Sequence, residues 1–222
     1  MVSLAVCLAM ARTMDAKSTL EAVRKHYEAL TTFSMVIEHK DSSGLFPGSY
    51  SGELKWRKGG HFQLTVTRPS DFVASESKPG MKAPDFYADG RNVVAVGAAG
   101  IRSTKPLAEE EVTMPGWEVA GTLVLSWLEG TANGKLVTNP VEGFKVEYSD
   151  GSRTEWQKTK VKELILTVKF GGEKQDASLF VSEDGHQLVG MEWKVGTKVG
   201  YYWCLNQKEN PKLPANIGEV PK

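Results

Sequence analysis

The chain has 222 residues, 41% of them hydrophobic, and its 27 basic and 27 acidic side chains leave a formal net charge of +0. This length and apolar content predict one large domain or two small ones with a substantial core. The balanced charge and the absence of a basic block argue against a nucleic acid as a partner.

The N-terminal segment resembles a secretory signal. An apolar run begins at Val2 and ends in Ala9-Met10-Ala11, which has small residues at the two positions that precede a signal cleavage site. No basic residue precedes the run, so a truncated start and a plain N-terminal helical turn are the alternatives. We expect a signal peptide over residues 1–16 and a single domain over residues 17–222.

An amphipathic helix is expected at the start of this domain. Ser18 and Glu21 have the spacing of a capping box at a helix N-terminus. Apolar residues then recur every three or four positions, which is the pattern of a helix with one buried face. These positions are Leu20, Val23, Tyr27 and Leu30.

Most of the remaining chain alternates apolar and polar residues with a period of two, the pattern of half-buried strands. Two such runs, 50–57 and 61–67, flank Gly59-Gly60 and predict a hairpin. Residues 153–160 are expected to form a polar strand centred on Trp156, and the chain from Tyr201 onward to form a proline-rich tail.

Residues 114–130 are the most apolar helix candidate in the chain. The helix expected within this range is about 14 residues long, which is too short to span a bilayer, so we expect it to lie on or inside the sheet. The residues that recur at helical spacing are Trp117, Ala120, Leu123, Val124, Trp127 and Leu128.

The number and spacing of these elements predict the fold class. About ten short strands joined by tight turns indicate an antiparallel meander, and a sheet of that size must curl or pair with a second layer. We expect a mainly β protein with a few helices (α+β), built as a strongly curved antiparallel sheet or incomplete β-barrel that helices cover.

Motifs for catalysis are absent from the sequence, which has no His-Glu-x-x-His, no Gly-x-Ser-x-Gly, no phosphate loop and no paired cysteine motif. We therefore expect no enzyme activity, no cofactor and no metal. Cys204 is expected to be a small buried apolar residue. The histidines are expected to be surface residues because none has short ligand spacing. They are His26, His39, His61 and His186.

The order of these elements resembles the LolA/LolB-like superfamily of bacterial periplasmic lipoprotein carriers. The phrases that carry the resemblance are Lys55-Trp56-Arg57, Phe62-Gln63-Leu64, Asp89-Gly90 and the closing 210–214. The resemblance covers most of residues 17–222. It implies an unclosed β-barrel, lidded by helices, whose hydrophobic interior accepts acyl chains.

The resemblance also implies a ligand-binding site on the helices and on the sheet. The implied lid residues are Leu20, Val23, Tyr27, Trp117, Leu123, Val124 and Trp127, and the implied lining residues are Leu54, Trp56, Phe62 and Leu64. Gln63 stands where the lipoprotein carrier has an arginine that helps to hold the lid. A neutral side chain cannot make that charge-assisted contact, which speaks against dedicated lipoprotein transfer.

Two functions follow as hypotheses. The first is a periplasmic carrier or binding protein for lipid or lipoprotein acyl chains, which is not an integral membrane protein. The alternative is an envelope sensor or protein-interaction module with the same fold, an envelope protein as partner and no transported lipid.

Overall fold

The computed structural model describes residues 15–42, 48–67, 85–97, 100–106, 124, 128, 144–170 and 173–221. These residues include a helix, α1 (Ala16–Glu28), and twelve strands. The strands are β1 (Thr32–Asp41), β2 (Gly48–Arg57), β3 (His61–Thr67), β4 (Asp85–Asp89), β5 (Asn92–Gly97), β6 (Gly100–Pro106), β7 (Phe144–Asp150), β8 (Glu155–Trp156), β9 (Thr159–Phe170), β10 (Glu173–Ser182), β11 (Leu188–Val195) and β12 (Lys198–Glu209).

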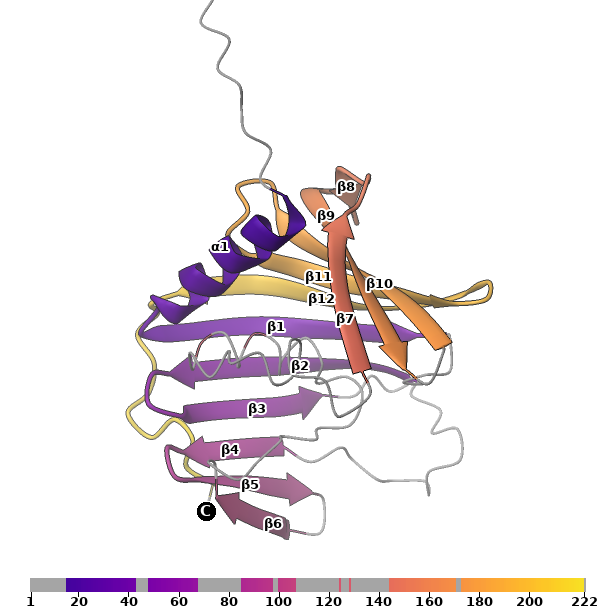
Figure 1. Ribbon diagram of the computed structural model, residues 1–222. Coiled ribbons are helices and arrows are strands. Elements are labelled where there is room, and N and C mark those ends of the chain that lie inside the picture. Colours follow the sequence, from indigo (N-terminus) through magenta and orange to yellow (C-terminus); the bar gives the residue numbers. More distant parts are fainter. Residues whose placement is uncertain are drawn as a thin grey trace, which may run out of the picture.

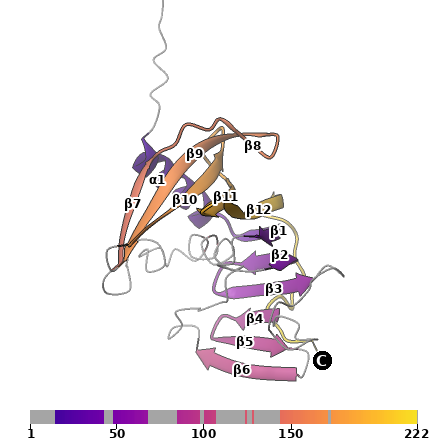
Figure 2. The same ribbon diagram turned by 90° about the vertical axis from the view of Figure 1, so that its right-hand side faces the viewer.

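The strands form one antiparallel sheet in the order β6-β5-β4-β3-β2-β1-β12-β11-β10-β9-β7, and β8 pairs with β9 beside this path (Figure 1). The sheet consists of two meanders, β1 to β6 and β7 to β12, that join where β1 pairs with β12. In Figure 2, β7, β9 and β10 stand at a steep angle to the stack of β1 to β6. This strong twist agrees with the curved antiparallel sheet expected from the sequence.

The helix α1 defines an inner face of the sheet, the face on which it packs. On β1 the side chains of Phe33, Met35 and Ile37 are buried and alternate with more exposed neighbours. They join buried residues of α1, Val23 and Tyr27, in the main hydrophobic core. The opposite, outer face carries a smaller apolar cluster formed by Trp156, Val161, Phe180 and Val189.

Two residues of the expected central helix lie within the described part of the chain. Val124 and Leu128 are both helical, and they are 0% and 1% exposed. Because they are four positions apart, they share one face of a helix, and both belong to the main core. The other site residues expected on this helix, Trp117, Leu123 and Trp127, lie outside the described residues.

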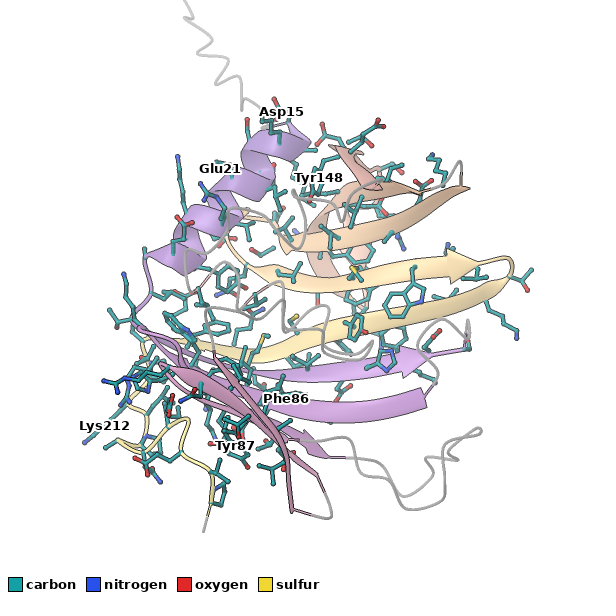
Figure 3. The ribbon with its side chains drawn as sticks, turned by 60° about the horizontal axis from the view of Figure 1, so that its bottom comes forward. Asp15, Glu21, Phe86, Tyr87, Tyr148 and Lys212 are labelled. Atoms are coloured by element: carbon teal, nitrogen blue, oxygen red, sulfur yellow. The ribbon has the colours of Figure 1, made fainter. Side chains whose placement is uncertain are left out.

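The hairpin expected around Gly59-Gly60 is confirmed as β2 and β3. The capping box is wrong, because α1 begins at Ala16 and its N-cap is Asp15, whose carboxylate accepts a 2.8 Å hydrogen bond from the Ser18 backbone N–H. Ser18 therefore belongs to the first turn, where backbone N–H groups need an outside acceptor. Glu21 instead pairs with Arg24 along the helix, and Figure 3 labels both Asp15 and Glu21.

Two expectations about strand boundaries are also wrong. The polar strand expected over 153–160 is a tight hairpin, because Gln157 and Lys158 adopt positive φ angles of 49° and 63° between β8 and β9. The chain from Tyr201 is part of the long strand β12, which pairs with β1 and β11 in the middle of the sheet. Within the described chain, no helix is long and apolar enough to cross a membrane.

Candidate ligand-binding face of the sheet

The structure brings the described members of the expected site together. Val23, Tyr27 and Val124 from the helices share one core with the strand residues, and Leu20 packs at its margin. The strand residues face each other across neighbouring strands, with Trp56 opposite Phe62 and Leu54 opposite Leu64. The residues so assembled are Leu20, Val23, Tyr27, Leu54, Trp56, Phe62, Leu64 and Val124.

Polar contacts attach α1 to the sheet near its two ends. In the C-terminal half, the Tyr27 hydroxyl donates a 2.7 Å hydrogen bond to Gln207 and accepts one of 3.1 Å from the Leu188 backbone N–H. Burial raises the pKa of this hydroxyl, so it remains neutral. Near the N-terminus of the helix, the Lys162 ammonium donates to the Thr19 hydroxyl. Between these attachments, Val23 contributes only apolar surface.

Strand β7 also contacts α1. Its Tyr148, labelled beside α1 in Figure 3, packs against the main core and is partly buried. The helix therefore contacts the edge strand β7 as well as Leu188 of β11 and Gln207 of β12.

One histidine contradicts the expectation that all four lie at the surface. His39 is 2% exposed on the inner face of β1, where its ring lies 4.7 Å from that of Tyr202 and stacks at 5.9 Å on that of Trp193. The signal was present in the sequence, because His39 continues the alternation of Phe33, Met35 and Ile37. Burial lowers the pKa of His39 to about 4, although the Asp41 carboxylate acts in the opposite direction. His39 is therefore a neutral imidazole near pH 7.

The remaining described histidines fit the surface expectation better. His26 stacks on His186 at 5.4 Å, and its Nε2 lies 2.8 Å from the Glu209 carboxylate. Among the residues that the structure describes, no group of three or more potential ligands is placed to hold a metal ion. Cys204 is buried on β12 with a free thiol, whose pKa burial raises to about 12.

Gln63 lies on the outer face, away from α1. It lines a cavity of about 400 Å³ together with Lys55 and several residues of the C-terminal segment 214–221. Its strand neighbours Phe62 and Leu64 point to the inner face. Gln63 is therefore on the far side of the sheet from α1 and does not contact this helix.

No family model matches the chain, and no curated protein matches it in sequence. Among solved structures, it is similar to the lipoprotein LppX of Mycobacterium tuberculosis, with 12% identity and a TM-score of 0.46 over 88% of this chain and 95% of LppX. It is also similar to a LolA superfamily protein of Nitrosomonas europaea, with 11% identity and a TM-score of 0.42 over 93% of this chain and 98% of that one. LprF of Mycobacterium bovis matches with 12% identity and a TM-score of 0.46 over 91% and 97% of the two chains.

All three matches have TM-scores below 0.5 and identities of 12% or less, so they do not assign this chain to a family. At such low identities and TM-scores they carry nothing about a ligand. The function has to be argued from the residues of this chain.

Proposed function

We propose that this protein binds a long apolar ligand, such as an acyl chain, between the inner face of its sheet and its helices. The observation that carries the proposal is the composition of that inner face. Side chains from α1, from Val124 and Leu128, and from strands of both meanders form one continuous apolar cluster. A curved sheet with helices on its inner face is a common way to enclose an apolar ligand.

The way α1 is attached supports a role in ligand entry. Its polar attachments lie near the ends of the buried stripe, with Lys162 to Thr19 at one end and both His26 to Glu209 and Tyr27 to Gln207 at the other. Between them, contact with the sheet is apolar and therefore has no directional requirement. An acyl chain can replace such contacts without leaving a buried polar group unsatisfied.

The energetics are adequate for a carrier. Burying a 16-carbon chain is worth roughly 0.8 kcal/mol per methylene, or about 12 kcal/mol in total. Loss of translational freedom and ordering of side chains offset roughly 4 to 15 kcal/mol of this gain. A net affinity that permits both uptake and release is the expected result. The signal-like apolar run that ends in Ala9-Met10-Ala11 supports a periplasmic location for this activity.

The first test measures which lipids copurify with the protein when cells produce it. The full chain is purified without detergent from the envelope fraction, extracted with organic solvent and examined by lipid mass spectrometry. We expect acyl lipids at a fixed stoichiometry. Empty extracts, together with no binding of a fluorescent fatty acid, would contradict the proposal. A single cross-linked envelope protein with no lipid would favour the sensor role instead.

The second test places a charge in the proposed interior. Val124→Glu puts a carboxylate among buried apolar side chains, and we expect fluorescent fatty-acid binding to fall by at least about tenfold. Val195→Glu is the matched control, because Val195 at the end of β11 is 39% exposed. Circular dichroism establishes that both variants are folded. Unchanged binding by folded Val124→Glu would place the ligand elsewhere.

A further inference from the structure

The inner face is not apolar along its whole length. At the end of β1, the alternation that buries Phe33, Met35 and Ile37 continues with His39 and Asp41. Phe33 and His39 are six residues apart on one strand, so about 20 Å separates the apolar end of the inner face, at Phe33, from its polar end, at His39. An acyl chain crosses about 15 Å in one leaflet of a bilayer, half of its hydrocarbon core. The inner face is thus long enough to hold an acyl chain with its polar group at the His39 end.

Strand register assembles the polar end from three strands. His39 on β1 faces Tyr202 on β12, and Trp193 on β11 faces Gly200, the residue that pairs with Asp41. The rings of Trp193 and Tyr202 lie 5.0 Å apart, and both rings lie close to that of His39. These three side chains, which we call the aromatic box, are all at least 97% buried.

Gly200 is required for this packing. A Cβ atom at this position would meet the Trp193 ring and the Asp41 carboxylate. The absence of a side chain on β12 is what allows the indole of Trp193 and the carboxylate of Asp41 to lie over the strand. The aromatic box therefore depends on Gly200 of β12 as well as on the three aromatic residues of β1, β11 and β12.

The chemistry of the box favours an uncharged polar group. A neutral imidazole offers one donor and one acceptor, a tyrosine hydroxyl offers both, and an indole offers one donor. The Asp41 carboxylate beside them disfavours a second negative charge. Ester, hydroxyl and amide groups suit such a set, whereas the carboxylate of a free fatty acid does not.

We propose that the aromatic box is a polar subsite that holds the uncharged polar group of an acylated ligand, with the acyl chain running along the inner face toward Phe33. This inference rests on the proposed function and adds the class of ligand: neutral acyl esters, alcohols or amides in preference to free fatty acids. The acylated terminus of a lipoprotein and an acylglycerol both present this chemistry.

The test compares two ligands with the same acyl chain. Monolaurin carries a neutral glycerol ester and laurate carries a carboxylate, and each displaces a fluorescent fatty acid from the delipidated full chain at pH 8. We expect monolaurin to bind about tenfold more tightly than laurate, which corresponds to about one well-placed hydrogen bond and the avoided charge repulsion. Equal binding, or tighter binding of laurate, would overturn the subsite.

Variants test whether the aromatic box causes the preference for monolaurin over laurate. We expect His39→Phe to weaken monolaurin binding about five- to tenfold and laurate binding less than about twofold, since the ring is retained but its nitrogens are lost. His186→Phe makes the same exchange at an exposed turn and should change neither affinity. If His39→Phe does not fold, Tyr202→Phe decides, because it removes one hydroxyl from the box. Equal losses for both ligands would overturn the inference, whereas failure of the wild type to bind either ligand would overturn the proposed function itself.

Discussion

Tyr27 and Gln207 connect the helix α1 to β12, a strand in the middle of the sheet. The Tyr27 hydroxyl donates a 2.7 Å hydrogen bond to Oε1 of Gln207, and the Gln207 amide donates one of 2.7 Å to the Leu188 carbonyl oxygen. The Leu188 N–H in turn donates to the Tyr27 hydroxyl at 3.1 Å. These three bonds close a ring of partners in which each group satisfies the next.

Removing the hydroxyl should open this ring. In Tyr27→Phe the buried Leu188 N–H and the Gln207 oxygen both lose a partner, so we expect the free energy of unfolding to fall by about 2 kcal/mol. Urea unfolding at equilibrium measures the change. Tyr201→Phe, on the half-buried outer side of β12, is the matched control and should change stability by less than about 0.5 kcal/mol. Equal effects of the two exchanges would show that the hydroxyl does not anchor α1.

On the outer face of the sheet, Glu163 likewise connects several groups through hydrogen bonds. Its carboxylate accepts hydrogen bonds from the backbone N–H groups of Ser152 and Arg153, both 3.0 Å, and from the Arg153 guanidinium at 2.6 Å. The same guanidinium reaches Glu192 at 2.9 Å and lies over the Phe180 ring. Burial acts to raise the pKa of Glu163, but these hydrogen bonds and the charge of Arg153 lower it below its ordinary value of 4.5.

The lowered pKa of Glu163 makes its contribution depend on pH. The stabilisation is fully present above the unfolded value of about 4.5 and is lost as pH falls through the lower folded value. We expect Glu163→Gln to cost about 2 to 3 kcal/mol at pH 7, and this difference from the wild type to shrink below about pH 4. Urea unfolding at both pH values checks this. Glu155→Gln, on the exposed part of the same hairpin, should cost little, and a difference for Glu163→Gln that is constant with pH would refute the ionic role.

The turn between β8 and β9 offers a stabilising change. Gln157 and Lys158 both adopt positive φ angles, the geometry of a type I′ turn, which favours Asn-Gly. The double variant Gln157→Asn/Lys158→Gly should raise stability by about 1 kcal/mol and the Tm by about 2 to 4 °C. Lys160→Gly places the same glycine in the strand β9, where we expect a loss of about 1 kcal/mol. A loss in both variants would contradict the assigned turn geometry.

The period-two pattern predicted most of the sheet, since alternation alone places Leu54, Trp56, Phe62 and Leu64 on one face. The same alternation places His39 on the buried face of β1, although a histidine is by its residue type more often found at the surface. The hairpin at Gln157 could not be predicted in this way. Neither of its turn residues is a glycine, asparagine or aspartate, so propensity gave no signal and tertiary packing of Trp156 decides the turn.

Long-range pairing was not predictable from local pattern. The joining of the two meanders depends on β1 pairing with β12, whose residues are far apart in the sequence, and no local signal specifies that register. The face of Gln63 shows the same limit. The resemblance identifies Gln63 as the position to compare with the arginine of the lipoprotein carrier. The side of the sheet on which Gln63 lies follows instead from the alternation of Phe62 and Leu64 around it.

Gly190 explains how Trp156 can lie flat on the outer face. A Cβ atom at Gly190 would meet both the Trp156 ring and the Tyr202 carbonyl oxygen. The indole also stacks on Phe180 at 4.5 Å and donates a 3.2 Å hydrogen bond to Glu192. A methyl group here therefore opposes a well-packed ring on one side and backbone on the other.

We expect Gly190→Ala to lower the free energy of unfolding by about 2 to 3 kcal/mol, because the carbonyl oxygen of Tyr202 cannot move without disturbing β12. Displacement of the Trp156 ring should also shift tryptophan emission to longer wavelength. Gly196→Ala is the control: its φ of 61° disfavours alanine, but no atom lies within 4 Å of the added methyl group. It should cost about 1 kcal/mol and leave the emission unchanged. If the two exchanges cost the same and neither shifts the emission, the ring does not rest on Gly190.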